Sequence, residues 1–100
     1  MTDFTIIQEL WDLIESRKNT PKKGSYTNRL LSDDALVLEK LKEELGEIIE
    51  ATNSNRIGSV DEKDSLVWET ADFIYHLMVL LASKNVSLDT IMEELQKRRK

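Results

Sequence analysis

Carboxylates recur at helical spacing in two segments of this sequence. Glu44 and Glu47 are three positions apart in one segment, and Glu69 and Asp72 are three apart in the other. Residues at this spacing are neighbours on one side of a helix. If the two helices pack antiparallel, the four carboxylates face one another and form an all-oxygen site for a hard divalent cation. Mg²⁺ prefers such a site, in which a few carboxylates, several waters and a substrate phosphate complete the coordination.

The same carboxylates also have ordinary structural interpretations. Glu43, Glu47 and Glu50 form one stripe that is compatible with a solvated helix face, whereas Glu44 lies closer to the apolar side. The second pair borders a very apolar stretch, where a buried carboxylate is costly unless it is paired with a cation or bound to a metal. Ion pairs with Arg or Lys therefore stay open as an alternative there, but the presence of both pairs favours the metal site.

Composition and charge restrict the other chemistry. The 100 residues include no cysteine and one histidine, His76, so neither disulfides nor a zinc site is expected, and His76 is interpreted as a hydrogen-bonded core residue. A net charge of −5 disfavours binding to nucleic acid, because the phosphate backbone repels an acidic chain. No apolar run is long enough for a membrane span and the start lacks a basic signal-peptide end, so a cytoplasmic location without a membrane partner is expected.

Hydrophobic periodicity predicts the helices that position these residues. The expected helices cover about residues 3–18, 34–53, 59–84 and 88–99, with a loop at about 19–28. The third is apolar nearly all the way round between Ala71 and Ala82, so it needs partners on every side. A small chain has few helices to supply them. We expect one all-α domain (1–100), a four-to-five-helix bundle completed by homo-oligomerisation; the alternative is a central helix wrapped by the other three.

The charges are segregated along the chain. Residues 33–96 hold fifteen acidic and five basic residues, and they include both carboxylate pairs. Residues 16–32 hold five basic residues and no acidic one. A basic segment beside an acidic body can bind a small phosphorylated ligand together with metal ions.

At these motifs the sequence resembles a known family. The runs EELGE (43–47) and ETAD (69–72) resemble the EExxE…ExxD signature of the MazG-like all-α nucleoside triphosphate pyrophosphohydrolases. The segments SYT (25–27) with LL (30–31), and ADFIYHLMVLLA (71–82), are similar to the phosphoribosyl-ATP pyrophosphohydrolases of histidine biosynthesis. The resemblance covers most of the chain.

The resemblance implies an activity and a set of site residues. It implies Mg²⁺-dependent hydrolysis of phosphoribosyl-ATP to phosphoribosyl-AMP and pyrophosphate, the second step of L-histidine biosynthesis, by a homodimer or higher homo-oligomer. The metal-binding acids of the family carry over to Glu44, Glu47, Glu69 and Asp72. Glu43 matches the first acid of the signature and could orient a water or support a ligand.

Substrate contacts are expected from the segment ahead of the acidic motifs. The candidate substrate-binding residues are Ser25, Tyr26, Thr27, Arg29 and Lys40, with Lys22 and Lys23 as further candidates for phosphate contacts. For any single lysine in this segment, a solvated loop is the simpler explanation.

Two other functions remain compatible with the sequence. A housecleaning pyrophosphohydrolase acting on ordinary or noncanonical (deoxy)nucleoside triphosphates would share the acidic motifs, although the Ser25–Thr27 segment and the Tyr75–His76 context favour phosphoribosyl-ATP. A helical dimerisation module without enzymatic activity would show no effect of divalent ions on thermal stability.

Overall fold

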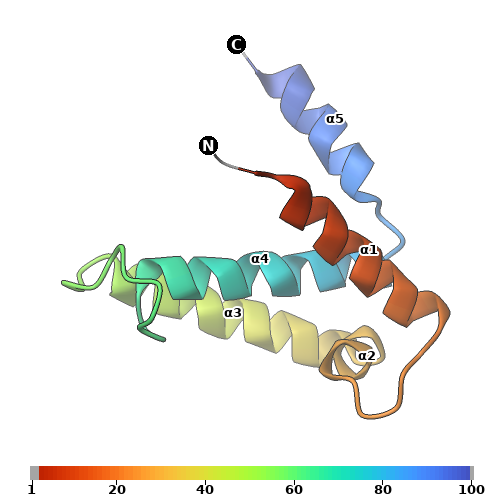
Figure 1. The fold of residues 1–100 in the computed structure, drawn as a ribbon, viewed down its shortest axis with the longest axis horizontal. Coiled ribbons are helices and arrows are strands. Elements are labelled where there is room, and N and C mark those ends of the chain that lie inside the picture. Colours follow the sequence, from red (N-terminus) through yellow and green to blue (C-terminus); the bar gives the residue numbers. More distant parts are fainter. Residues whose placement is uncertain (1–2, 100) are drawn as a thin grey trace.

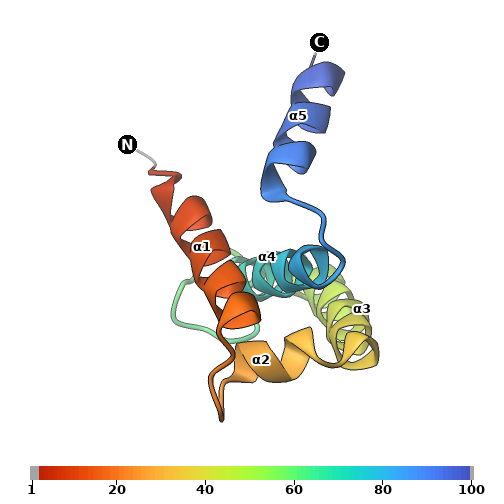
Figure 2. The same cartoon turned by 90° about the vertical axis from the view of Figure 1, so that its right-hand side faces the viewer.

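A computed structural model describes residues 3–99 and is all-helical over that range. The five helices are α1 (Thr5–Asn19), α2 (Tyr26–Leu31), α3 (Asp34–Ala51), α4 (Leu66–Ser83) and α5 (Leu88–Arg98). The long helices α3 and α4 lie side by side and antiparallel, α1 crosses α4, and α2 lies against the end of this pair (Figure 1). Helix α5 projects away from the other four (Figure 2). The expected all-α class is confirmed.

Side-chain caps explain where the helices begin. Ser25, Asp33, Ser65 and Ser87 precede α2, α3, α4 and α5, and each accepts a hydrogen bond from a backbone N–H in the first turn of its helix. Such caps satisfy donors that have no partner within the helix. At the other end of α4, Asn85 takes a φ of 59°, a left-handed conformation that stops the helix.

Two boundaries expected from the sequence are wrong. The loop expected over residues 19–28 ends earlier, because α2 begins at Tyr26. This six-residue helix is too short to show a hydrophobic period. The helix expected to begin at residues 59–61 begins instead at Leu66, because residues 59–65 belong to a loop that is held by its own contacts. In that loop the Ser65 hydroxyl donates to the Ser59 carbonyl oxygen (2.5 Å), and Arg56 pairs with Asp64.

The core forms where α1 and α2 meet α3 and the second half of α4. Its buried residues are Trp11, Ile14, Leu30, Val37, Met78, Val79 and Ala82. Burying these side chains supplies most of the drive for packing. Because Leu30 and Val79 belong to this core, α2 is fixed against α4 beside Tyr75 and His76.

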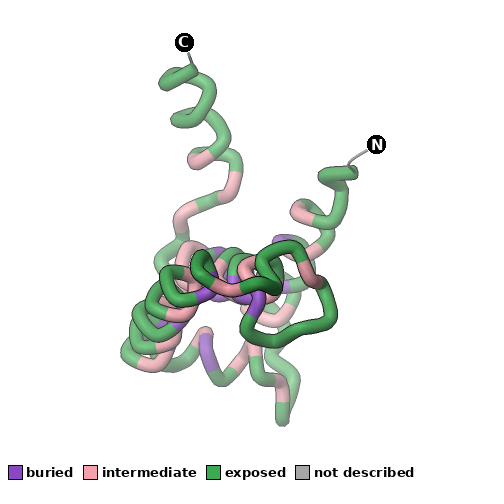
Figure 3. The backbone as a smooth tube through the Cα atoms, turned by 90° about the vertical axis from the view of Figure 1, so that its left-hand side faces the viewer, coloured by how far each residue is buried: buried purple, intermediate pink, exposed green. Residues whose placement is uncertain are grey.

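Part of the apolar surface is not covered within the described residues. By length and composition alone α4 is long and apolar enough to cross a membrane, although Glu69 and Asp72 interrupt its apolar sequence. It packs against α1, α2 and α3 and contributes Met78, Val79 and Ala82 to the core. Ile74 and Leu77 on α4 stay partly exposed, and α5 contributes no buried residue (Figure 3). The alternative of a central helix wrapped by the other three is therefore not what the structure shows, and completion of the bundle by homo-oligomerisation stays a prediction.

Candidate active site

Two carboxylates are buried where α3 and α4 face each other. Glu44 on α3 is 6% exposed and Glu69 on α4 is 5% exposed. Glu44 Oε1 and Glu69 Oε2 are both shielded from solvent and accept no hydrogen bond from the residues described. Because an unpartnered buried carboxylate oxygen costs free energy, such a pair needs a functional explanation.

The pKa values of both buried carboxyl groups are raised. Burial is the main cause at Glu69 and raises its pKa to about 8, with further contributions from the adjacent Glu47 carboxyl group and from the charges of Asp72 and Glu44. Burial also raises the pKa of Glu44, and the opposing effect of His76 does not cancel it. The carboxyl groups of two residues on α3 and two on α4 thus act on one another at short range, as expected if the two helices pack antiparallel. These residues are Glu44, Glu47, Glu69 and Asp72.

The other acids of the signature are more accessible. Glu47 and Asp72 are half-buried, and Glu43 is exposed and pairs with Lys40 at 3.8 Å. Across residues 3–99, no three carboxylate or imidazole groups lie in metal-ligating geometry. The structure therefore gathers the predicted acids at one place without arranging them as a ligand set.

His76 connects α4 to both neighbouring helices. Its Nδ1 atom lies 2.9 Å from the Asp72 carbonyl oxygen and 2.9 Å from Glu44 Oε1, and only the carbonyl has hydrogen-bond geometry. Since a carbonyl accepts, Nδ1 carries the proton. In the neutral ring Nε2 then accepts from the Tyr26 hydroxyl at 2.9 Å. The prediction of a hydrogen-bonded core histidine is confirmed, and the structure adds which residues are its partners.

The candidate substrate residues on α2 have several different roles. Ser25 caps α2, and the Thr27 hydroxyl lies 2.6 Å from the Tyr75 hydroxyl. The consecutive residues Tyr26 and Thr27 thus pair with His76 and Tyr75 on α4.

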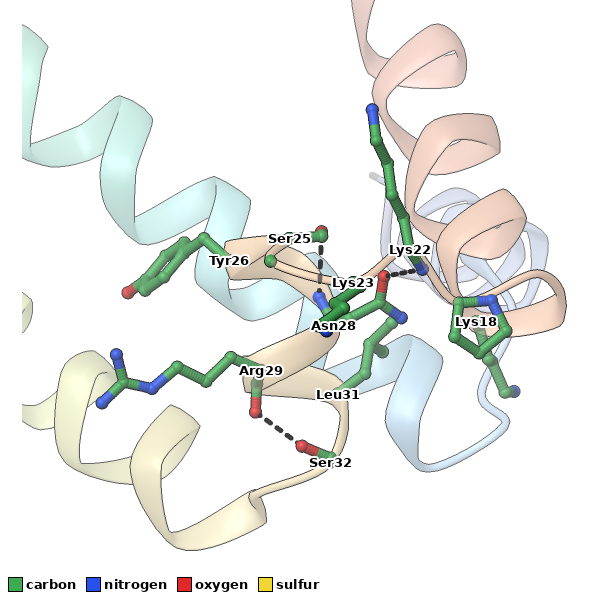
Figure 4. Close-up of a pocket in the computed structure, with 11 residues that line it drawn as sticks. Lys18, Lys22, Lys23, Ser25, Tyr26, Asn28, Arg29, Leu31 and Ser32 are labelled. Carbon is green, nitrogen blue, oxygen red and sulfur yellow. Dashed lines mark hydrogen bonds between the residues drawn. The ribbon is translucent and has the colours of Figure 1, made fainter.

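A basic cavity of about 900 Å³ lies on α2 and the loop before it (Figure 4). It is lined by four cationic residues, Lys18, Lys22, Lys23 and Arg29, together with Ser25, Tyr26 and Asn28. No acidic residue lines it. Of the predicted substrate residues, Ser25, Tyr26 and Arg29 therefore border one cavity, whereas Thr27 and Lys40 do not line it.

A second cavity, of about 740 Å³, lies at the opposite end of the α3 and α4 pair. Glu47 and Glu69 line it, and so do Arg56 and Lys63 of the loop between these helices. Sequence reasoning missed both cations. The Asn, Ser and Gly residues of that loop, directly after the first acidic motif, are the only sequence signal that a loop approaches the acids.

Comparison with known proteins shows which family this chain resembles. The family model described as "Phosphoribosyl-ATP pyrophosphohydrolase" matches residues 7–99. A phosphoribosyl-ATP pyrophosphatase of Methanococcoides burtonii is 38% identical and covers 97% of this chain and 95% of its own length. One from Lactiplantibacillus plantarum is 44% identical over 92% of this chain and 82% of its own length. A histidine biosynthesis bifunctional protein of Caldanaerobacter subterraneus subsp. tengcongensis is 42% identical over 95% of this chain and 44% of its own length.

The family match and these relatives define a hydrolase that acts on a phosphoric anhydride, and the all-helical fold is consistent with this class. More narrowly, the chain belongs to the phosphoribosyl-ATP pyrophosphohydrolase family. The relatives favour this family over the housecleaning alternative.

Proposed function

We propose that this chain hydrolyses phosphoribosyl-ATP to phosphoribosyl-AMP and pyrophosphate in histidine biosynthesis, and that it does so with Mg²⁺. Family membership supports the reaction. The observation that carries the site assignment is the pair of buried, unpartnered oxygens, Glu44 Oε1 and Glu69 Oε2, on facing helices. No described lysine or arginine forms an ion pair with Glu69 or Asp72, so the ion-pair alternative for these two residues gains no support.

The donor chemistry of these residues fits Mg²⁺. All four predicted ligands, Glu44, Glu47, Glu69 and Asp72, offer carboxylate oxygens, and two of the oxygens lack any other partner. Burial raises the pKa of Glu69, and the neighbouring Glu47, Asp72 and Glu44 add to this effect; a bound divalent cation would offset both. When bound, Mg²⁺ would lower the pKa of a coordinated water and neutralise negative charge that develops on the phosphates.

The protein contributes position and charge around the reacting phosphates. Glu44 is held by burial, and the His76 Nδ1 atom lies 2.9 Å from its Oε1 without hydrogen-bond geometry. Glu43 is exposed one position away and can accept a hydrogen bond from a water that attacks the triphosphate. Arg29, Lys22 and Lys23 line the separate basic cavity on the α2 side, where they supply cations for another part of the substrate. Such positioning is the main contribution of proteins to phosphoryl transfer.

The test is turnover of phosphoribosyl-ATP by the purified chain, with and without Mg²⁺, compared with dCTP and dUTP. We expect Mg²⁺-dependent release of pyrophosphate from phosphoribosyl-ATP, and much slower reaction of the other two. Preference for dCTP or dUTP would contradict the substrate assignment, and equal turnover in EDTA would contradict the metal.

We also propose that two copies of the chain pair through the uncovered apolar surface. An apolar cavity between α1, α4 and α5 is lined by residues that include Phe4, Ile74, Leu77 and Met92, all of which stay exposed. A second copy could cover this surface with its own apolar helices. Sedimentation should show a dimer for the parent and a monomer for Leu77→Glu. A monomeric parent would contradict this proposal.

A further inference from the structure

We infer that the basic cavity on α2 binds the phosphate of the phosphoribosyl group, the one phosphate of the substrate that does not react, and that it does so without a metal. This inference rests on the proposed function and adds a specificity site to it. The cavity would distinguish phosphoribosyl-ATP from an ordinary nucleoside triphosphate, which has no such group.

The two polar cavities differ in charge. The basic cavity has four cationic lining residues and no acidic one. The acidic cavity beside Glu47 and Glu69 has six acidic and two basic lining residues. One of its two bases, Arg56, is already paired with Glu62 (3.5 Å) and Asp64. An anion that enters the acidic cavity therefore needs added cations, whereas an anion in the basic cavity does not.

The substrate carries two anionic groups that are far apart. Its triphosphate lies on one side of the adenine ring, and its phosphoribosyl group is attached on the other. The bond that breaks is in the triphosphate, so this group must lie at the carboxylates of α3 and α4. The remaining phosphate is a monoester with a charge of about −1.5 to −2 at neutral pH, and it needs cations elsewhere.

Tyr26 connects the basic cavity to the acidic residues. It lines the cavity, and its hydroxyl lies 2.9 Å from His76, which in turn lies 2.9 Å from Glu44. Glu69 lies seven residues before His76 on α4, and this corresponds to a distance of about 10 Å along the helix axis at 1.5 Å per residue. The adenosine and ribose parts that lie between the two phosphate groups of the substrate would have to span this separation together with the length of the Tyr26 side chain.

Arg29 and the loop lysines are placed for this role. Figure 4 shows Tyr26 and Arg29 extending from α2 toward α3 and α4, whereas Lys18 and Lys22 lie toward α1. Lys22, Lys23 and Arg29 form no ion pair within residues 3–99, so their charges are available to a ligand. Lys18 is less available, because its Nζ donates to the Asn85 side chain.

The backbone that carries the lysines is held in place. Asn28 Oδ1 accepts from the Lys22 backbone N–H (2.8 Å), and Asn28 Nδ2 donates to the Arg17 carbonyl oxygen (2.7 Å). Gly24 has a φ of 83°, in the left-handed region that favours glycine, and lets the loop turn into α2. A loop held at both sides loses less entropy when a phosphate binds.

The experiment compares binding of phosphoribosyl-AMP and AMP, which differ only by the phosphoribosyl group, by calorimetry in Mg²⁺. For the parent we expect phosphoribosyl-AMP to bind at least about tenfold more tightly, about 1.4 kcal/mol. The ratio of the two affinities, for phosphoribosyl-AMP over AMP, should fall toward one in the double variant Lys22→Ala/Lys23→Ala and in Arg29→Ala. It should be kept in Lys22→Arg/Lys23→Arg and in Lys63→Ala, the matched control in the acidic cavity.

Metal independence has its own readout. Ribose 5-phosphate added in EDTA should shift the backbone amide resonances of residues 22–32 in the parent and not in the double alanine variant. Equal binding of the two nucleotides by the parent would overturn the inference, as would a ratio that the alanine variants leave unchanged. Loss of the ratio in Lys63→Ala, or no amide shifts in EDTA, would also overturn it. Failure of the proposed function would instead appear as absent turnover of phosphoribosyl-ATP by the parent.

Discussion

The Tyr26 hydroxyl lies 2.9 Å from His76 Nε2, and these two residues are fifty positions apart in the sequence. The contact ties the short helix α2 to the middle of α4, and through His76 it reaches Glu44 on α3. One hydrogen bond thus links the basic cavity to the buried carboxylates. Its removal should affect both stability and substrate binding.

Replacing Tyr26 by Phe leaves His76 Nε2 without its partner. We expect the free energy of unfolding to fall by about 0.5–1.5 kcal/mol, and the KM for phosphoribosyl-ATP to rise because α2 is held less firmly. Urea unfolding and steady-state kinetics measure the two effects. A double-mutant cycle with His76→Asn is the control. Strictly additive effects of the two substitutions would show that the contact contributes nothing.

Replacing Asp72 by Asn removes one proposed metal ligand with little change in shape. We expect the circular dichroism spectrum to be kept and kcat/KM to fall more than about 100-fold, beyond the range typical of residues that only orient a ligand. Asp12→Asn, an exposed change on α1, is the matched control and should leave turnover unchanged. Full activity of Asp72→Asn would remove it from the proposed metal site.

The raised pKa of Glu69 predicts how stability depends on pH in EDTA. This pKa is about 8 in the folded chain against an ordinary value of 4.5. Between these values the folded chain keeps a proton that the unfolded chain has released, so the free energy of unfolding falls as the pH rises toward 8 and through it.

Replacing Glu69 by Gln removes the ionisable group and should flatten this decline. Urea unfolding at about pH 5 and about pH 9 measures it in both proteins, and at the higher pH Glu69→Gln should be the more stable. The assignment would be contradicted if the free energy of unfolding of the parent and that of Glu69→Gln changed by the same amount between these two pH values.

Mg²⁺ should stabilise the folded chain by mass action. At about 100 times its Kd, a ligand that binds only the folded state adds about 2.7 kcal/mol. Because binding displaces protons from the carboxyl groups, the effect should grow with pH. Thermal unfolding with Mg²⁺, and with NaCl at equal ionic strength, separates binding from screening. Equal stabilisation of the parent and Asp72→Asn by Mg²⁺ would contradict a specific site.

The packing of α1 against the core leads to a prediction that does not depend on the function. Ile14 on α1 is 0% exposed, whereas Ile6 on the same helix is 61% exposed. Ile14→Ala should lower the free energy of unfolding by about 2–5 kcal/mol through lost burial and a residual cavity. Ile6→Ala should change it by less than about 0.5 kcal/mol. Chemical denaturation of both variants measures the difference, and similar losses would show that α1 packs differently.

Local patterns in the sequence determined a large part of this protein. The all-α class and the four longer helices followed from hydrophobic periodicity, because the spacing of apolar residues reflects the turn of the helix itself. The position of Glu44 near the apolar side of its helix followed in the same way, and the structure shows it buried. The resemblance to the pyrophosphohydrolases rested on short motifs that are also local.

Only the tertiary structure decided which residues meet. Helix α2 is too short for a periodic signal, and its position depends on Leu30 packing in a core built from other helices. The contacts of Tyr26 with His76 and of Thr27 with Tyr75 cross about fifty residues, and no local pattern encodes them. The burial that raises the pKa of Glu69 likewise arises from packing between helices. The sequence therefore supplied the acids and their spacing, while long-range packing determined their burial and the separation of the two cavities.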